Sequence, residues 1–203
     1  TCRSLAELAP GTLFLYGSTP VPCGAWYERT ATGEYKIFWN LTGAREELIG
    51  SARIKLRGEH NLLNIAAAAL AARAAGADCE AITTAISEYT GLEHRLEYVA
   101  TIDQVQYFDD SFATAPEPTI VALRAFQEPV ILIAGGVDKG ANYLPLAEEI
   151  LASSVKVVVL IGKMAPALRE IITNLGLEKG KIPLIVEGGD EMSLIMATAT
   201  KFA

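Results

Sequence analysis

One segment of the chain concentrates the side chains that could do chemistry. It carries a histidine beside an arginine, and after an extended stretch it ends in two aspartates followed by two hydroxyls. This pattern places a cation, carboxylates and hydroxyls at the carboxyl end of a strand, where ligands bind in open α/β sheets. We therefore predict a ligand site here; the competing interpretation is that the aspartates are solvated strand-end residues. The residues concerned are His94, Arg95, Asp109, Asp110, Ser111 and Thr114.

A glycine-rich loop, AGGVDKGAN at residues 134–142, follows an apolar run of strand length. Gly135 and Gly136 would let a backbone approach a ligand closely. Lys139 could offer a point charge to a phosphate or a carboxylate. The loop matches neither GxGxxG nor GxxxxGK[ST], and the second pattern occurs nowhere in these 203 residues. The loop alone is thus a weak signal, and it disfavours a nicotinamide-dependent dehydrogenase.

The segment GEHNLLN, residues 58–64, opens an alanine-rich helix that we predict over residues 61–75. Alanine favours the helix and allows close packing. Asn61 and Asn64 lie one turn apart on the same face. Asn61 is either a plain helix N-cap or a ligand-binding side chain, and His60 is either a structural or a ligand-binding histidine. The sequence alone leaves both choices open.

Strands and helices are mixed in the part of the chain up to residue 96. Four aromatic side chains fit a half-buried pleated surface, so they are expected to pack a sheet. Asp78 is expected to cap a helix that runs through Tyr89. The predicted elements are helices at 4–9, 61–75 and 78–89 and strands at 12–16, 25–29, 35–40 and 51–56; the aromatic residues are Trp26, Tyr27, Phe38 and Trp39, and the expected buried stripe of the last helix is Cys79, Ile82, Ile86 and Tyr89.

Beyond residue 97, apolar runs of strand length alternate with amphipathic helices. The runs VILIA and VVVLI are continuous, which is typical of strands covered on both faces. Four consecutive strand–helix units predict an α/β fold with a parallel, doubly wound, Rossmann-like sheet. Thr114 and Glu117 have the spacing of a capping box, and Pro116 fits a first helical turn. The predicted strands are 105–108, 130–134, 156–161 and 182–186. One predicted helix ends near residue 126, two span 145–152 and 164–175, and the last begins at residue 190. The predicted domains are residues 1–96 and 97–203.

Composition narrows the class of protein. A net charge of −7 and a pI of about 4.9 argue against binding to nucleic acid or to an anionic membrane surface. Three cysteines without a CxxC motif predict reduced thiols in a cytoplasmic protein, and two histidines without metal-ligand spacing predict no metal site. We see no apolar run of about 18 residues and no signal peptide. Both ends enter helix-like patterns directly, so we expect a fragment of a longer chain.

Four segments in this order resemble the motif set of the Mur ligases, the ATP-dependent amide-forming enzymes of bacterial peptidoglycan synthesis. The segments are GEHNLLN, GLEHR, DDSFAT and GGVDKG. The DKG form of the last, followed by Asn-Tyr-x-Pro-Leu, is similar to the members that add D-glutamate to UDP-N-acetylmuramoyl-L-alanine. The resemblance covers essentially the whole chain, as the end of a central ATPase domain and most of a C-terminal Rossmann-like domain. It implies an ATP- and Mg²⁺-dependent reaction through an acyl phosphate, in a monomer.

The resemblance also implies roles for single residues. The HNxxN segment and the aspartate of the DS motif match nucleotide contacts, and the arginine of the HR motif contacts ATP from the domain junction. Two residues match the positions that hold the carboxylates of D-glutamate. Of these residues, Arg95 and Lys139 are expected to be catalytic. By the resemblance, His60, Asn61, Asn64, Arg95 and Asp110 bind ATP, and Thr114 and Lys139 bind D-glutamate.

The sequence departs from the family pattern at Phe112, which stands where the DS motif usually continues with a lysine. This removes one cation from the nucleotide or product side. The family's P-loop and metal-binding residues would precede Thr1, so we expect these 203 residues alone to have no ligase activity. Two alternatives stay open: another Mur ligase or a folylpolyglutamate synthase-like enzyme, and a non-catalytic binding module on the same fold, which Phe112 mildly favours.

Overall fold

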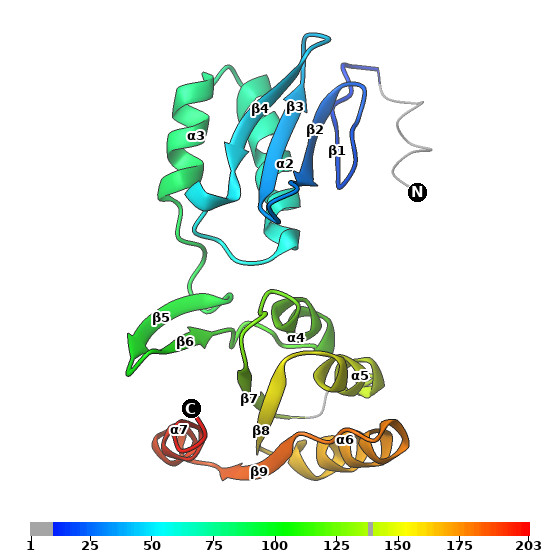
Figure 1. Cartoon of the computed structure of the whole chain (residues 1–203), viewed down its shortest axis with the longest axis vertical. Helices are drawn as coiled ribbons and strands as arrows, with labels where there is room; N and C mark the ends of the chain where they lie inside the picture. Colours follow the sequence, from blue (N-terminus) through cyan, green and yellow to red (C-terminus); the bar gives the residue numbers. More distant parts are fainter. Residues whose placement is uncertain (1–9, 138–139) are drawn as a thin grey trace. The chain divides into compact units, whose positions relative to one another are not determined.

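Two units make up the chain, and they divide between Gly91 and Leu92 (Figure 1). The computed structural model describes residues 10–137 and 140–203, so the helix predicted at 4–9 lies outside the described residues. The units divide slightly before the predicted boundary near Leu96. The physical reason is that the residues just before Leu96 are hydrogen-bonded to a segment of the second unit, as described below.

The first unit is built on a four-stranded sheet in the order β1–β2–β3–β4. β1 runs parallel to β2, and the other neighbours are antiparallel. The predicted hairpin is confirmed, because β2 and β3 pair in register from Gly24 opposite Asn40 to Arg29 opposite Tyr35. The strands are β1 (Leu15–Gly17), β2 (Gly24–Arg29), β3 (Tyr35–Asn40) and β4 (Arg45–Gly50).

Two strand predictions in this unit are wrong in detail. The strand predicted at 12–16 is only the short β1, and the one predicted at 51–56 is a 3₁₀ turn, η1 (Ser51–Arg53). The strand that closes the sheet, β4, was not predicted. Its first three residues are charged and exposed, and only Leu48 and Ile49 are buried. A run so polar lacks the regular alternation of a half-buried strand, and its pairing with β3 decides its conformation.

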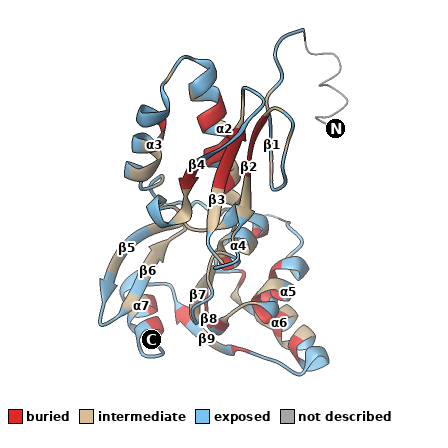
Figure 2. Ribbon diagram, turned by 45° about the horizontal axis from the view of Figure 1, so that its top comes forward, coloured by how far each residue is buried: buried red, intermediate tan, exposed pale blue. Residues whose placement is uncertain are grey.

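Helices α2 (Glu59–Ala74) and α3 (Cys79–Glu88) pack against the sheet and share one core with it (Figure 2). Asp78 caps α3 as predicted, since its Oδ1 accepts a hydrogen bond of 2.7 Å from the backbone N of Ala81. The expected buried stripe of α3 is confirmed at Ile82, which is buried, and in part at Ile86, which is half-buried against the core, and it is wrong at Cys79 and Tyr89, which are exposed. The helix therefore contacts the sheet through a narrower face than its apolar residues predict. The core consists of Ala25, Ile37, Trp39, Leu48, Ile49, Leu62, Ile65, Ala66, Ala69, Leu70 and Ile82.

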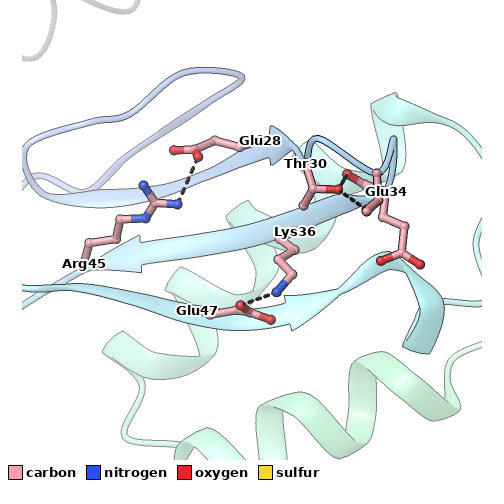
Figure 3. A network of polar contacts seen from close by, with 7 residues as sticks. Glu28, Thr30, Glu34, Lys36, Arg45 and Glu47 are labelled. Atoms are coloured by element: carbon pink, nitrogen blue, oxygen red, sulfur yellow. Dashed lines mark hydrogen bonds and ion pairs between the residues drawn. The ribbon is translucent and has the colours of Figure 1, made fainter.

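The aromatic residues of β2 and β3 pack the sheet, as predicted. Trp26 stacks with Phe38 at a centroid distance of 6.1 Å, and the guanidinium of Arg45 lies 3.8 Å from the centre of the Phe38 ring. Ion pairs run across the sheet beside this stack, from Arg45 on β4 over β3 to Glu28 on β2, and from Lys36 on β3 to Glu47 on β4 (Figure 3). The rings are therefore covered by cross-strand contacts rather than presented as a stacking platform.

The second unit contains a parallel sheet of three strands, in the order β7–β8–β9. Its central strand β8 is buried almost throughout, which confirms the inference from the continuous run VVVLI. Helices α4, α5 and α6 contribute to a core on one face of β8, and α7 packs on the other face. The elements are β7 (Val130–Gly135), β8 (Val155–Ile161), β9 (Leu184–Gly189), α4 (Pro116–Leu123), α5 (Leu144–Ala152), α6 (Ala165–Lys179) and α7 (Met192–Thr200).

The strand predicted at 105–108 belongs to a separate hairpin, which corrects the expectation of four parallel strands. β5 (Glu97–Ile102) and β6 (Val105–Asp109) pair antiparallel around a turn of Asp103 and Gln104. Both turn residues have a left-handed backbone, with φ of 49° and 68°. A turn with this backbone matches the twist of a hairpin. The pair Asp-Gln lacks the glycine by which such a turn is usually predicted from sequence. The local partner β5 therefore takes the hydrogen bonds of β6.

Phe108 joins this hairpin to the rest of its unit. Its ring packs edge-on against Tyr98 of β5 at 5.7 Å and against Phe126, just after α4, at 5.1 Å. Edge-to-face pairs of this kind add to the burial of the rings. Within the part of the chain that the structure describes, none of the helices is both long enough and apolar enough to span a bilayer.

Candidate functional site

The predicted ligand-binding segment is a hydrogen-bonded cluster at the open end of the β5–β6 hairpin. Glu97, the first residue of β5, lies opposite Asp109, the last residue of β6. Nδ1 of His94 lies 2.8 Å from Oδ2 of Asp109, and the backbone N of His94 donates to Oε2 of Glu97 at 2.7 Å. The side chain of His94 is 54% exposed. The pairing of two strands thus brings together charges that are well separated in sequence.

Asp110 and its successors bind the backbone of the same loop. Oδ1 of Asp110 accepts a hydrogen bond of 2.9 Å from the backbone N of Leu96. The backbone N of Phe112 donates to the carbonyl of His94 at 3.0 Å. Ser111 donates its backbone N–H to Oδ1 of Asp109 at 2.8 Å, which turns the chain away from the strand. The two aspartates are therefore structural ties as well as candidate ligand groups.

The paired charges shift each other's titration. The hydrogen bond and charge of Asp109 raise the pKa of His94 above its ordinary value, and Glu97 and Glu93 add smaller contributions. The hydrogen bond from His94 lowers the pKa of Asp109, and the backbone N–H of Ser111 adds to this effect. Both shifts favour the charged forms, so the cluster holds an imidazolium beside a carboxylate over a wider pH range than either group would alone.

Arg95 lies between the two tied residues and is exposed. Within residues 10–137 and 140–203, its guanidinium has no ion pair or side-chain hydrogen bond, so it is available to a ligand. Thr114 is exposed in the loop before α4. The capping box expected for Thr114 is wrong: Ala115 occupies the N-cap and no side chain caps the helix, while Pro116 occupies the first turn as predicted. The Phe112 ring is 66% exposed.

Of the glycine-rich loop, Asp138 and Lys139 lie outside the described residues, so the predicted role of Lys139 remains a prediction. A Cβ on Gly135, at φ 144°, would lie 1.9 Å from the carbonyl oxygen of Ile161. Only glycine therefore fits at position 135, where β7 pairs with β8. A Cβ on Gly136 would meet nothing within 4 Å, but the backbone N of Gly136 donates to the carbonyl of Ile161 at 3.1 Å and its carbonyl accepts from the backbone N of Met164 at 3.0 Å.

The other predicted nucleotide contacts lie at the start of α2, in the first unit. The N-cap of α2 is Gly58 with φ 89°, so Asn61 is not the N-cap. Instead, Nδ2 of Asn61 donates to the carbonyl of Arg57 at 2.7 Å, and Nδ2 of Asn64 donates to Oδ1 of Asn61 at 3.2 Å. Asn64 is exposed and His60 is half-buried. The asparagines are thus linked to each other, as their spacing predicted.

Glu59 is a residue of this region that the sequence analysis missed. Its carboxylate accepts hydrogen bonds from the hydroxyls of Tyr27 and Tyr35, on neighbouring strands β2 and β3. Burial first, and then the bond to Glu59, raise the pKa of Tyr27; the bond to Glu59 is the main cause for Tyr35. Glu59 thereby ties the first turn of α2 to the sheet. The two tyrosines come together only because β2 pairs with β3. A local sequence pattern therefore does not predict this contact.

The cluster at the hairpin also bears on metal binding. One potential ligand atom from each of His94, Glu97 and Asp109 lies within 4.8 Å of the others. Mg²⁺ prefers an octahedron of oxygens, whereas this group includes a ring nitrogen and carboxylates already bound to N–H groups. These three residues therefore do not fit an Mg²⁺ site.

Comparison with known sequences relates the chain to one enzyme. It is 34% identical over 176 residues to the UDP-N-acetylmuramoylalanine–D-glutamate ligase of Symbiobacterium thermophilum, covering 87% of this chain. It is 40% identical over 172 residues, 83% of this chain, to the ligase of the same name from a Roseiflexus species. The matched part is only 38% and 37% of these relatives. No family model matches the chain.

Solved structures support the same fold. MurF from Acinetobacter baumannii matches with a TM-score of 0.60 at 15% identity, covering 92% of this chain and 45% of that protein. The UDP-N-acetylmuramate–alanine ligase MurC from Thermotoga maritima matches with a TM-score of 0.57 at 16% identity, covering 92% of this chain and 46% of that protein. At such low identity these likenesses establish the α/β fold alone.

Proposed function

Because this chain belongs to the Mur ligase family, we propose that the complete protein adds D-glutamate to UDP-N-acetylmuramoyl-L-alanine with ATP. The observation that carries the proposal is 34–40% identity, over more than four fifths of the chain, to ligases named for this reaction. The chain spans less than two fifths of those relatives, so the activity is proposed for the complete protein. On this proposal, residues 1–96 end the central ATP-binding domain and residues 97–203 belong to the C-terminal domain.

The proposed reaction has two steps. The carboxylate of the acceptor attacks the γ-phosphorus of ATP, which forms an acyl phosphate and releases ADP. The amine of D-glutamate then attacks the acyl carbon, and inorganic phosphate leaves as the amide forms. Neither step requires a covalent bond to the protein, so catalysis depends on positioning and on cations that meet the developing phosphate charge.

The proposal assigns ATP contacts to five single residues, each described within its own unit. The exposed guanidinium of Arg95 suits phosphate oxygens, because its planar fork can donate two hydrogen bonds at once. Asp110 is half-buried and is assigned to the ribose side, with one oxygen already bound to Leu96. His60, Asn61 and Asn64 are assigned to the nucleotide. Mg²⁺ would accompany ATP and offset the charge of its phosphates.

D-glutamate brings two carboxylates to the proposed site. Lys139 supplies a positive charge to one of them, and the hydroxyl of Thr114 donates a hydrogen bond to the other. The reaction consumes ATP and a nucleotide sugar, which is the ground for placing the enzyme in the cytoplasm. We further propose that the enzyme acts as a monomer.

The test follows phosphate release by the complete protein from ATP, with UDP-N-acetylmuramoyl-L-alanine as acceptor. D-glutamate, L-lysine, L-alanine and diaminopimelate are offered in turn. We expect release with D-glutamate only. Lys139→Ala should raise the KM for D-glutamate by roughly 100-fold, because a charge-assisted contact is worth about 1.5–3 kcal/mol. Lys179→Ala removes an exposed lysine at the end of α6 and should leave the kinetics unchanged.

The possible results of this test separate the proposed function from its alternatives. Release with another amino acid would assign the protein to a different member of the family. No release with any of the four would favour a non-catalytic binding module, for which the exposed Phe112 in place of a cation is the supporting observation. Equal KM values for D-glutamate in Lys139→Ala and Lys179→Ala would remove Lys139 from the site.

A further inference from the structure

The residues on either side of Arg95 have an unusual backbone. His94 and Leu96 have φ of 61° and 47°, in the left-handed region that L side chains rarely adopt. Residues in this region persist only when surrounding contacts hold them. Arg95 therefore sits at the apex of a turn whose shape is imposed from outside the turn.

One short segment, Asp109–Phe112, supplies three of the contacts that hold this turn, and Oε2 of Glu97 accepts another from the backbone N of His94. Asp109 binds the ring of His94 at 2.8 Å, and Phe112 donates its backbone N–H to the carbonyl of His94 at 3.0 Å. Asp110 accepts from the backbone N of Leu96 at 2.9 Å. The residue before Arg95 and the residue after it are each anchored, whereas the Arg95 guanidinium itself has no partner among the residues that the structure describes.

We infer that His94, Asp109 and Asp110 form a positioning device for Arg95, which fixes the peptide of this arginine so that its guanidinium projects toward a phosphate-bearing ligand. The inference rests on the proposed function for the identity of that ligand, ATP. It assigns to His94 and Asp109 a task that the motif resemblance does not give them, and it gives Asp110 a second task through its Leu96 contact. A preorganised cation gains more from a phosphate contact than a mobile one, since less freedom is lost on binding.

Asp109 is the residue to change, because the proposed function assigns it no contact with ATP or D-glutamate. Asp109→Ala removes both the His94 and the Ser111 contacts, and Asp109→Asn keeps an acceptor oxygen without the charge. Asp103→Asn is the matched control: it removes the same charge from the exposed turn of the same hairpin, where asparagine tolerates the left-handed backbone equally well.

A double-mutant cycle in the complete protein tests whether Asp109 acts through Arg95. We expect Arg95→Ala to raise the KM for ATP by roughly 100-fold and Asp109→Ala by roughly tenfold, with Asp109→Asn in between the wild type and Asp109→Ala. In the Arg95→Ala background, Asp109→Ala should add no further increase. A further tenfold increase there would mean that Asp109 acts independently of Arg95 and would overturn the inference, as would an unchanged KM in Asp109→Ala.

A second measurement separates this inference from the proposed function. Hydrogen exchange of the complete protein should show faster exchange at the Leu96 and Phe112 amides in Asp109→Ala than in the wild type and Asp103→Asn. If no ligation is found at all, the proposed function fails but this exchange difference still tests the device. Unchanged exchange at both amides in Asp109→Ala would refute the positioning role even in an active enzyme.

Discussion

The parallel sheet and the β5–β6 hairpin belong to one unit, but different forces hold them. In β8, Val158 and Val159 are fully buried and point to opposite cores. Every residue of β5 and β6, all of them described, keeps some exposure. At the strand ends, ion pairs and backbone hydrogen bonds take the place of burial. The sheet therefore provides stability, and the hairpin provides a local geometry at a surface that a ligand can reach.

This difference explains why the candidate site lies at the hairpin. A charge buried in the sheet would need a partner and would be costly to move. At the hairpin the same charges stay hydrated, so their pairing contributes little to global stability but can still orient nearby groups. Changes in the sheet should therefore reduce the free energy of unfolding, whereas changes at the hairpin should alter ligand binding and titration.

The largest effect on stability is expected from Ile172→Ala in α6. The Ile172 side chain is fully buried in the core on one face of β8. Truncation of a buried isoleucine costs about 2–5 kcal/mol, because transfer energy is lost and a cavity forms. Urea denaturation followed by far-ultraviolet circular dichroism measures the loss. Leu177→Ala is the matched control on the same helix, at 68% exposure, and should change stability by no more than about 0.5 kcal/mol. Equal losses would contradict the packing described for α6.

A smaller loss is expected from Gly135→Ala, at the end of β7. The added methyl group would meet the Ile161 carbonyl, so the strand must shift at a cost of about 1–3 kcal/mol. Gly136→Ala also occupies a positive φ but points into open space, so it carries the backbone strain without the clash. Thermal denaturation of both variants isolates the clash as the difference in Tm. A Gly136→Ala that is as unstable as Gly135→Ala would show that strain alone accounts for both.

The smallest effect on stability is expected from changes at the His94–Asp109 pair. Their clearest effect is on the pKa of His94. An NMR pH titration should place its pKa above the ordinary value of 6.5 in the wild type, and Asp109→Asn should lower it. In the 203-residue chain, which has two histidines, a His60→Gln background leaves one histidine signal, which makes the assignment unambiguous. Asp103→Asn should leave the pKa of His94 where it is. A pKa of His94 that is the same with and without Asp109 would contradict the ion pair.

The direction of the pH dependence follows from the two shifts. Because the pKa of His94 is raised in the folded state, its contribution to stability is complete below its ordinary pKa and is lost as the pH rises through the raised value. Because the pKa of Asp109 is lowered, its contribution is present above its ordinary pKa and is lost as the pH falls through the lowered value. Both contributions are therefore complete between the ordinary pKa of Asp109 and the ordinary pKa of His94.

Several features could be predicted from neighbouring residues alone. These features depend on side-chain types within a few positions of one another, so local patterns predicted them. They are the β2–β3 hairpin, the Asp78 cap, the Pro116 first turn and the buried strand β8. Others could not be predicted in this way. β4 is polar for half its length, and β6 pairs with β5 around a turn without glycine, so pairing between strands decided both.

The sequence by itself determined the family, the α/β class and the order of the candidate residues, because these depend on residue identity and spacing. Only the tertiary structure decided what those residues contact. Asp109 lies beside His94, and Asp110 lies beside Leu96, because β5 and β6 pair in one register. Glu59 contacts two tyrosines because β2 and β3 also pair in one register. Register is set by the hydrogen bonds and packing of whole strands. The same residues could therefore be identified as candidates from the sequence, while their division between ligand contact and positioning depends on the fold.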